Sequence, residues 1–528
     1  MHRENLSRII CFGVAITTFA LLVAEGLLNL TPPISRDALI HHLAIPKLWL
    51  RQGEFYEIPW AKYSYYPMNI DLLYLLCLYF RNDIVPKFVH LAFGLGTGLL
   101  VYLHLKQKFN RNWGLLGGLV FLSTPIVIRL STTAYVDLGL TFFTTGAILL
   151  FLRWQDSNYL QLRWFFLSAV AMGLAMGCKY NAIIPWVFLG LVATYYFARD
   201  TKKEGKAVGY GIFFFLVSLL VVSPWYIKNY LLTSNPFYPL FDGLFNPSQP
   251  TDGSGGGGIG FFQRRELVYG ETFWETLLIP LRMFFQGRDH SPQYFDGVLN
   301  PILVLLTPFG LLKKTTRQNT ILFIAISVFV LLTVFFLGAA KIRYVLPVVP
   351  LLAIASTTGI KVLMDFFANR QGLVRCATLV VVGTTALCLI SNLQYLTAYF
   401  RTIRPMDYIR QRETKDQFLA RHMASYPAVR YINENLPDTV EIFLVFMAGR
   451  GYYIDRNYYH ERSFGRKTVK EFVTASMIGE QDFLARLRSC RFSHILVRKD
   501  LFHKYLVDNF HRESIERFLR FTGKYWRS

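Results

Sequence analysis

Long apolar stretches recur along the first 396 residues and limit what this chain can fold into. The hydrocarbon core of a bilayer is about 30 Å thick, and about 20 mostly apolar helical residues cross it. The sequence is 53% hydrophobic. Eleven stretches are apolar and long enough to be candidates: 8–30, 85–105, 112–131, 137–153, 163–179, 181–198, 208–227, 298–312, 319–338, 342–364 and 373–396. We therefore expect a polytopic α-helical membrane protein with about 11 transmembrane helices.

A twelfth apolar stretch, 67–80, is short, and the Lys and Arg residues decide where it lies. If it lies along the membrane surface, every basic loop between the later helices falls on the cytoplasmic side, as the positive-inside rule requires. If it spans, those loops fall outside. We therefore treat 31–84 as a first outer loop with juxtamembrane helices, the N-terminus as cytoplasmic and the C-terminus as extracytoplasmic. The net charge of +22 then belongs to the cytoplasmic loops and does not indicate nucleic-acid binding.

Two further segments are expected on the outer side. Residues 228–297 form a long loop whose glycine-rich run, Asp252 to Gly260, predicts flexibility. Residues 397–528 are more polar, with helix-like patterns at 428–436 and 480–490 and strand-like runs at 442–446 and 494–497. The predicted organisation is a transmembrane domain, 1–396, followed by a small extracytoplasmic α/β domain, 397–528.

Charged residues gather near the expected outer ends of the helices. They are Glu25, Arg129, Asp137, Lys179, Lys228, Lys341 and Arg343. A charge near the bilayer centre costs about 3 kcal/mol on insertion scales, so such residues are candidates for function. The Lys and Arg side chains have an alternative role, because they can extend to the headgroups. A carboxylate is too short for that, which singles out Asp37 and Asp137. The asymmetry predicts a polar cavity that opens to the outer leaflet.

Asp37 opens the first outer loop in the segment Ser35-Arg-Asp-Ala-Leu-Ile-His-His42. A helix that starts there puts Asp37 and His41 on one face. One role for Asp37 is an N-terminal helix cap, and the other is a general base for an acceptor hydroxyl. The pair His41 and His42 is weak evidence for a metal site, so we expect no cofactor and leave a divalent ion open.

Several segments together resemble the GT-C glycosyltransferases that use polyprenyl-phosphate sugars, above all the branch of the aminoarabinose transferases and protein O-mannosyltransferases. These segments are 35–42, 133–137, 177–181, 224–230, 340–347 and 451–456. The resemblance implies that Asp37 is catalytic, that Asp137 is a second acid, and that Lys179 lines the cavity. Lys341 and Arg343 lie in a segment similar to the family's basic segment before a late span.

The sequence departs from the family pattern at two places. Asp37 is followed by Ala38, where the family commonly has Glu, and Tyr65-Tyr66-Pro67 replaces a Glu-Lys pair before the proline. The charge that the missing lysine would give to the donor phosphate is then expected from Lys179, Lys341 and Arg343. The residues with predicted substrate contacts are His41, Tyr65, Tyr66, Arg129 and Lys228.

The predicted activity is an inverting transfer of a sugar from a polyprenyl-phosphate carrier to an extracytoplasmic lipid, glycan or protein. The predicted partners are this donor, the acceptor and the lipid bilayer, and the predicted location is a bacterial inner membrane. The alternative is a transporter or flippase of lipid-linked precursors, which also needs a polar cavity within the membrane. The charges at one side of the membrane, rather than at its midplane, favour the transferase.

Overall fold

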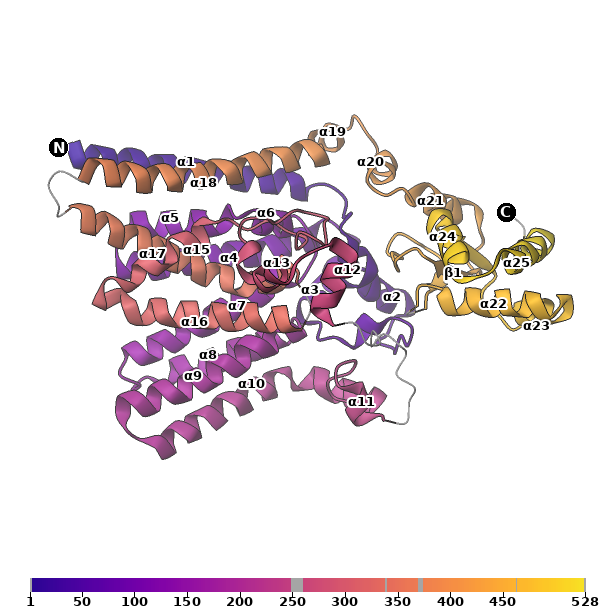
Figure 1. The fold of residues 1–528 in the computed structure, drawn as a ribbon, viewed down its shortest axis with the longest axis horizontal. Coiled ribbons are helices and arrows are strands. Elements are labelled where there is room, and N and C mark those ends of the chain that lie inside the picture. The colour runs from indigo at the N-terminus through magenta and orange to yellow at the C-terminus, as the bar shows by residue number, and fades with distance from the viewer. Residues whose placement is uncertain (1, 248–259, 338–339, 369–373, 462, 527–528) are drawn as a thin grey trace. The chain divides into compact units, whose positions relative to one another are not determined.

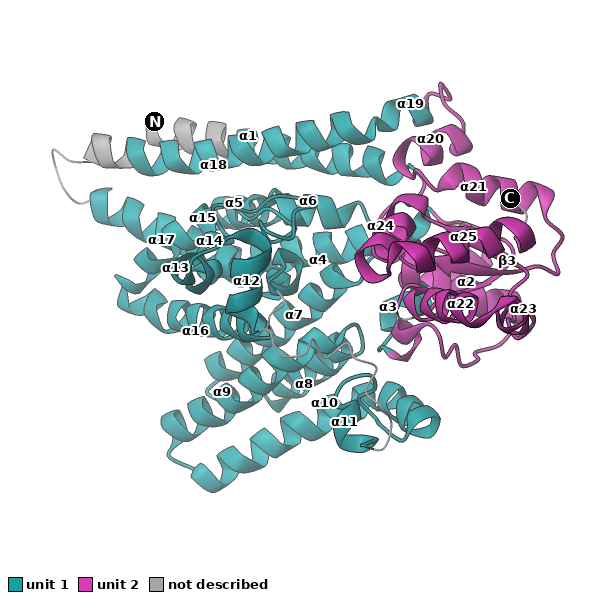
Figure 2. Ribbon diagram, turned by 45° about the vertical axis from the view of Figure 1, so that its right-hand side comes forward, with its two compact units in different colours: residues 1–31, 66–73, 84–409 teal, residues 32–65, 74–83, 410–528 magenta. Residues whose placement is uncertain are grey.

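The structure is a computed structural model that describes residues 2–247, 260–337, 340–368, 374–461 and 463–526 (Figure 1). The glycine-rich run lies outside these ranges, except for Gly260. Contacts within the chain form two compact units, coloured in Figure 2. Unit 1 contains residues 1–31, 66–73 and 84–409, and unit 2 contains residues 32–65, 74–83 and 410–528. The predicted transmembrane domain, 1–396, and extracytoplasmic domain, 397–528, stay predictions.

Unit 1 is a bundle of long helices that run side by side (Figure 1). Within the described ranges, eight helical segments are long and apolar enough to cross a membrane. They lie in α1 (His2–Asn29), α4 (Val85–Lys108), α7 (Asp137–Asp156), α9 (Ile183–Thr201) with the turn before it, α10 (Glu204–Thr233), α16 (Lys314–Phe336), α17 (Val349–Ala368) with the turn before it, and α18 (Val374–Ile403). Each coincides with one of the predicted stretches.

The three remaining predicted stretches coincide with a bent pair of helices and two shorter helical segments. The bent pair is α5 (Arg111–Leu122) and α6 (Pro125–Ser131), whose axes differ by 71°. Pro125 begins α6, and because proline has no N–H and fixes its backbone, the first helix ends before it. The shorter segments are α8 (Leu162–Met176) and the run Ile302–Leu311, which contains α15 (Ile302–Leu305) and η4 (Thr307–Leu311). The prediction of a polytopic helical membrane protein is confirmed.

The stretch 67–80 forms α3 (Asn69–Tyr79), a helix of 11 residues. At about 1.5 Å per residue it is about 16 Å long, roughly half of what a crossing needs. Its first residue is fixed to the end of α8, because the Asn69 amide N–H donates to the carbonyl of Gly177 at 2.9 Å. The absence of a side chain at Gly177 matters here, since a Cβ would lie 2.0 Å from Asn69 Nδ2.

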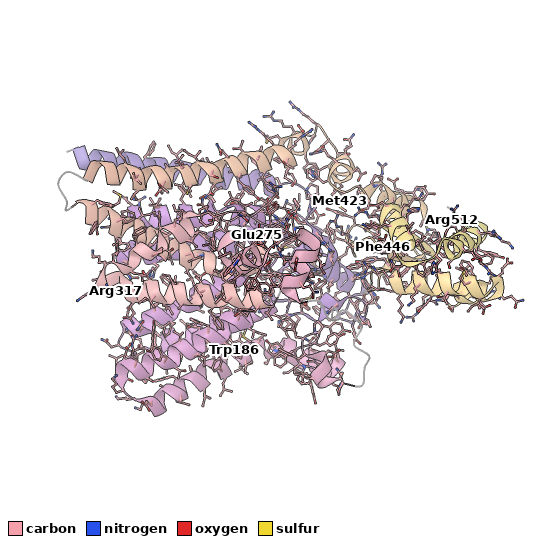
Figure 3. The ribbon with its side chains drawn as sticks, viewed as in Figure 1. Trp186, Glu275, Arg317, Met423, Phe446 and Arg512 are labelled. Carbon is pink, nitrogen blue, oxygen red and sulfur yellow. The ribbon has the colours of Figure 1, made fainter. Side chains whose placement is uncertain are left out.

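The helices α7 and α17 form the centre of unit 1. Of the most apolar window of each, 72% and 94% of the residues are buried, whereas α1 and α18 reach only 22%. The centre of α7 packs against α4 and α8, and its start packs against η5 (Ile342–Val348). The polar residues at the start of α7 therefore lie inside the bundle. Trp186 on α9 and Arg317 on α16 are labelled in Figure 3.

Unit 1 has further short elements between its long helices. They are η3 (Tyr180–Ala182), α11 (Asp242–Phe245), α12 (Phe261–Tyr269), α13 (Phe273–Leu277), α14 (Ile279–Arg282) and α19 (Pro405–Ile409).

Unit 2 contains a three-stranded parallel sheet in the order β2-β1-β3. The strands are β1 (Glu441–Val445), β2 (Asn457–Tyr459) and β3 (His494–Val497). The helices of this part of the chain are α20 (Lys415–His422), α21 (Tyr426–Asn435), α22 (Arg466–Ile478), α23 (Glu480–Arg488), α24 (Lys499–Asn509) and α25 (Arg512–Tyr525). The two predicted strands and two predicted helices are confirmed, and Phe483 of α23 is fully buried in the core of this unit.

Unit 2 also includes most of the first predicted outer loop. This segment forms η1 (Ala38–His42), α2 (Ala44–Gln52) and η2 (Lys62–Tyr65). The Lys47 ammonium donates to the carbonyl of Tyr452 at 2.7 Å and forms an ion pair with Asp455 at 2.7 Å. Burial lowers the pKa of Lys47, and the hydrogen bond with Asp455 opposes this effect. The Tyr453 hydroxyl donates to the carbonyl of Pro33 at 2.8 Å. A loop at the start of the chain and the C-terminal region thus fold as one unit.

Candidate functional site

Asp137 and Lys179 form a buried ion pair in unit 1. Asp137 is the first residue of α7, and its side chain is 2% exposed. Lys179 follows α8 in extended backbone, and its Nζ lies 2.7 Å from Asp137 Oδ1. The second oxygen, Asp137 Oδ2, is buried and has no hydrogen-bond partner in the described part of the chain. An acceptor lone pair in this position can take a hydrogen bond from a ligand.

Two further basic residues come from the segment before α17. The Arg343 guanidinium lies 5.3 Å from the ring centre of Tyr344 and 5.7 Å from that of Tyr135. The Lys179 ammonium lies 5.2 Å from the same Tyr344 ring, and Arg343 also acts electrostatically on Asp137. Lys341 is the residue directly before η5, the segment that contains Arg343 and Tyr344, and it acts electrostatically on Tyr344. The structure therefore brings together four of the predicted residues, which we call the basic cluster: Asp137, Lys179, Lys341 and Arg343.

His90 of α4 holds the start of α7 in place. Its side chain is fully buried, and its Nε2 accepts a hydrogen bond from the Leu138 N–H at 2.9 Å. The other ring nitrogen, Nδ1, lies 2.9 Å from the carbonyls of Leu130 and Thr133. These contacts require a neutral ring that carries its proton on Nδ1. His90 thus connects α4, the end of α6 and the residue next to Asp137.

Arg129 belongs to a separate ion-pair network at α6. Its guanidinium pairs with Asp289 at 2.7 Å and with Asp296 at 3.1 Å. Asp289 also accepts a hydrogen bond from the Tyr395 hydroxyl at 2.5 Å. Burial alone would raise the pKa of Asp296, but the charge and hydrogen bond of Arg129 outweigh it, so the pKa lies below its usual value. Arg129 therefore binds two carboxylates of one loop of this chain, those of Asp289 and Asp296.

Two other predicted substrate contacts in unit 1 lie on different elements. Lys228 is on α10, and its ammonium lies 5.1 Å from the ring centre of Trp225. The Tyr66 ring packs edge-on against Tyr180 at 5.1 Å, next to Lys179 in the sequence. Their roles toward a substrate stay predictions.

Asp37, His41 and Tyr65 lie in unit 2. Asp37 immediately precedes η1, a five-residue π-helix, and its side chain makes no capping hydrogen bond. Single π-helical turns are rare and occur often at functional sites. The His41 ring lies 4.0 Å from that of His42 and is stacked on Tyr63 at 4.3 Å. The Tyr65 hydroxyl donates to Glu57 at 2.5 Å. Asp37 thus starts a tight, aromatic-packed turn.

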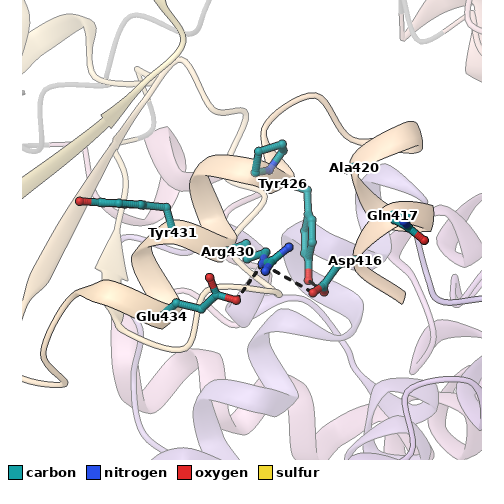
Figure 4. Close-up of a pocket in the computed structure, with 8 residues that line it drawn as sticks. Asp416, Gln417, Ala420, Tyr426, Arg430, Tyr431 and Glu434 are labelled. Carbon is teal, nitrogen blue, oxygen red and sulfur yellow. Dashed lines mark hydrogen bonds and ion pairs between the residues drawn. The ribbon is translucent and has the colours of Figure 1, made fainter. Parts of the chain in front are cut away.

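A shallow pocket of 330 Å³ lies on α20 and α21 of unit 2 (Figure 4). Its charged groups are paired with one another: Arg430 contacts Glu434 at 2.7 Å and Asp416 at 3.6 Å. The Tyr426 hydroxyl donates to Asp416 at 2.7 Å. We assign no chemistry to this pocket, because its polar atoms already bind each other. Over the ranges that the structure describes, no three His, Cys, Asp or Glu side chains gather as metal ligands would.

Sequence reasoning missed the residues that hold the basic cluster. Tyr344 lies in the segment 340–347, which the family resemblance singles out, but nothing in the sequence indicates that its ring contacts Lys179 and Arg343. His90 is one of two histidines in the apolar stretch 85–105, and its place there was the available signal. Asp289 and Asp296 lie in the loop 228–297, and nothing in their spacing indicates that they pair with Arg129.

Residues 61–242 match the family model of dolichyl-phosphate-mannose-protein mannosyltransferases. Among proteins with curated descriptions, none matches this sequence. The fold is similar to that of ArnT from Cupriavidus metallidurans bound to undecaprenyl phosphate, with a TM-score of 0.54 and 13% identity. This match covers 94% of this chain and 95% of that chain. Apo ArnT matches with a TM-score of 0.50 and 14% identity, over 90% and 95% of the two chains.

A third similar structure is the oligosaccharyltransferase of Archaeoglobus fulgidus in complex with Zn and sulfate, with a TM-score of 0.52 and 12% identity. It covers 93% of this chain and 69% of that chain. At these identities the structures establish the fold, and the family model adds an independent match at the level of sequence. The chain therefore has the fold of these membrane proteins, and the match over 61–242 is a likeness at the level of sequence.

Proposed function

We propose that this protein is a membrane glycosyltransferase of the GT-C superfamily, that it takes its sugar from a polyprenyl phosphate, and that the basic cluster holds the phosphate of that donor. The supporting observation is that Lys179 and Arg343 act on the Asp137 carboxylate and that both, together with Lys341, act on Tyr344. Undecaprenyl phosphate is bound in the similar ArnT structure, which is consistent with a ligand of this class.

The charge of the basic cluster suits a departing phosphate. Three cations and one carboxylate leave a local charge of about +2, and a phosphate monoester carries about −1.5 to −2 at neutral pH. When the sugar leaves, negative charge grows on the phosphate oxygen, and cations already in position stabilise it without rearranging. Cations held by Tyr344 and Asp137 fulfil that condition, because their positions are fixed before the donor binds.

Asp137 has two tasks in this proposal. Its Oδ1 keeps the Lys179 ammonium in position, and its Oδ2 accepts a hydrogen bond from a sugar hydroxyl. A hydrogen bond from a neutral donor to a carboxylate is stronger than one between neutral groups. Asp137 therefore orients the donor and the phosphate-binding cation together.

Asp37 is the proposed general base. It removes the proton of the acceptor hydroxyl as that oxygen forms a bond to the anomeric carbon, and the bond from this carbon to the phosphate oxygen breaks. The electron pair of the broken bond leaves with the phosphate. One displacement of this kind inverts the anomeric centre. The proposal for Asp37 rests on its place in the first predicted outer loop, directly before η1, and on the family resemblance of its segment.

The proposed acceptor is an extracytoplasmic lipid, glycan or protein, and the proposed location is a bacterial inner membrane with a cytoplasmic N-terminus. This orientation puts the loops after α4, α7 and α9 in the cytoplasm, where their Lys and Arg residues satisfy the positive-inside rule. No divalent ion is required by the proposed chemistry, since the cations are side chains.

The test is release of polyprenyl phosphate by the purified protein from donor lipid in the presence of candidate acceptors, measured by mass spectrometry. A transferase releases it only when an acceptor is present, whereas a transporter moves the intact donor and releases none. The variant Lys341→Gln should bind the donor less tightly. Lys206→Gln, an exposed lysine on α10 with no predicted substrate contact, is the matched control for the loss of one positive charge within unit 1.

A further inference from the structure

A cavity of 940 Å³ lies in unit 1 at the opposite end of α7 from Asp137. Helices α4, α7, α8 and the start of α16 line it. On α7 the charged residues of the lining, Arg153 and Asp156, lie about 24 Å or more along the helix from Asp137, so the charged end of the cavity is distinct from the basic cluster. Its volume is near the top of the range of about 300–1,000 Å³ that is usual for ligand pockets.

The lining of the cavity changes from apolar to charged along its length. On α7 it begins with Phe142 and Phe143, continues past Gly146, and ends with Arg153 and Asp156. Phe142 to Asp156 spans about 21 Å of helix, more than the half-thickness of a bilayer core of about 30 Å. Along α4 the same change runs from Leu100 to Lys108. An apolar cavity with a charged end matches the two parts of a lipid, an apolar acyl chain and a polar headgroup.

The charged end has more cations than anions. Lys108, Arg153 and Lys314 line it together with one carboxylate, that of Asp156. Within the described ranges, none of these three cations forms an ion pair with a carboxylate. The Arg153 guanidinium lies 5.3 Å from the ring centre of Trp164, which restricts its position. Arg317, one turn beyond Lys314, is labelled at this end of the bundle in Figure 3.

His104 gives a second, independent sign of a ligand. It lies between the apolar and charged parts of the lining, and its Nε2 is buried with no hydrogen-bond partner in the described part of the chain. A buried polar atom without a partner is rare in folded proteins. A hydroxyl or ester group at the head of a bound lipid would satisfy it.

We propose that this cavity binds an anionic phospholipid, with its phosphate between Lys108, Arg153 and Lys314 and one acyl chain along Phe142 and Gly146. The predicted orientation places this end at the cytoplasmic leaflet, where anionic lipids attract basic residues. The site is separate from the proposed donor site and does not depend on the proposed activity.

The experiment is native mass spectrometry of the full-length protein in detergent, titrated with dioleoyl phosphatidylglycerol or dioleoyl phosphatidylcholine. The expected result is retention of phosphatidylglycerol under conditions that strip phosphatidylcholine. The triple variant Lys108→Gln/Arg153→Gln/Lys314→Gln should reduce its occupancy by about tenfold or more. The matched control is Lys106→Gln/Arg163→Gln/Lys206→Gln, which removes the same charge from residues that do not line the cavity.

A second variant tests the apolar part without a change of charge. At Gly146 an added Cβ would meet only Leu100 Cδ1, at 3.9 Å, so Gly146→Leu should fold and fill the cavity. It should also lower retention of phosphatidylglycerol. Lys341→Gln, at the proposed donor site, should leave retention unchanged. Equal retention of the two lipids, equal loss in the control triple variant, or displacement of phosphatidylglycerol by inorganic phosphate would each overturn the proposal.

Discussion

Replacing Lys179 with Met should separate the stability of the basic cluster from its function. The substitution keeps much of the aliphatic volume but removes the ammonium 2.7 Å from Asp137 Oδ1. The Asp137 side chain is 2% exposed, so its charge would remain buried without its direct partner. Breaking a buried pair in this way costs about 3–5 kcal/mol. Because Arg343 still acts on Asp137, we expect the lower end, about 3 kcal/mol.

The double variant Asp137→Asn/Lys179→Met removes both charges. The Asn amide leaves buried polar atoms to be satisfied, which costs about 1–3 kcal/mol. We therefore expect the double variant to be more stable than Lys179→Met alone, with a coupling of about 1–2 kcal/mol between the two positions. Release of polyprenyl phosphate should stay low in both variants, because neither has the ammonium that would bind the phosphate.

The assay is thermal unfolding in detergent followed by tryptophan fluorescence, since the chain has nine Trp residues. The unfolding midpoint should be highest for the wild type, lower for the double variant and lowest for Lys179→Met. A Lys179→Met protein as stable as the wild type would refute the reasoning about the buried pair. A double variant with normal release of polyprenyl phosphate would refute the assignment of Lys179 to the donor phosphate.

Three more outcomes are expected. Asp37→Asn should abolish transfer without changing the unfolding midpoint, while Glu54→Gln, an exposed acid of the same loop, should transfer normally; near-normal turnover by Asp37→Asn would remove the general base from the proposal. His90→Ala should lower stability by about 1–3 kcal/mol, since the Leu138 N–H loses its partner, and an unchanged midpoint would contradict this role. The pKa of Asp296 lies below its unfolded value of about 3.9, so its stabilising contribution is present above about pH 4 and is lost as the pH falls through the folded pKa. Asp296→Asn should therefore reduce the acid sensitivity of the unfolding midpoint below about pH 4, and an identical pH profile would argue against it.

The helices of the bundle could be predicted from sequence because the requirement is simple. A membrane-crossing helix must be apolar over its whole length, and this is visible in one stretch at a time. The bend between α5 and α6 was less visible, although Pro125 marks it. The grouping of 32–65 with 410–528 depends on contacts between segments about 400 residues apart, such as Lys47 with Tyr452, and no local pattern predicts them.

The basic cluster was predicted in part. Asp137, Lys179 and Arg343 could be proposed together because each is a charge near the end of an apolar stretch, and the structure places them close to one another. Arg129 satisfied the same criterion, yet it binds Asp289 and Asp296 of the following loop. A charged residue near the end of an apolar stretch can thus be predicted to be buried, but the residue with which it pairs cannot. Tyr344 and His90 carry no charge at neutral pH and are ordinary residues in an apolar segment, so only the fold reveals their contacts.

The most direct test of the central claim is the identity of the lipid that this protein consumes. The purified protein should be incubated with a polyprenyl-phosphate sugar and an extract of cell-envelope acceptors, and the lipid products identified by mass spectrometry. The account predicts free polyprenyl phosphate together with an acceptor whose mass has increased by one sugar, and it predicts the loss of both products in Asp37→Asn. An unchanged donor with every acceptor fraction, from protein that is folded by its unfolding midpoint, would contradict the account.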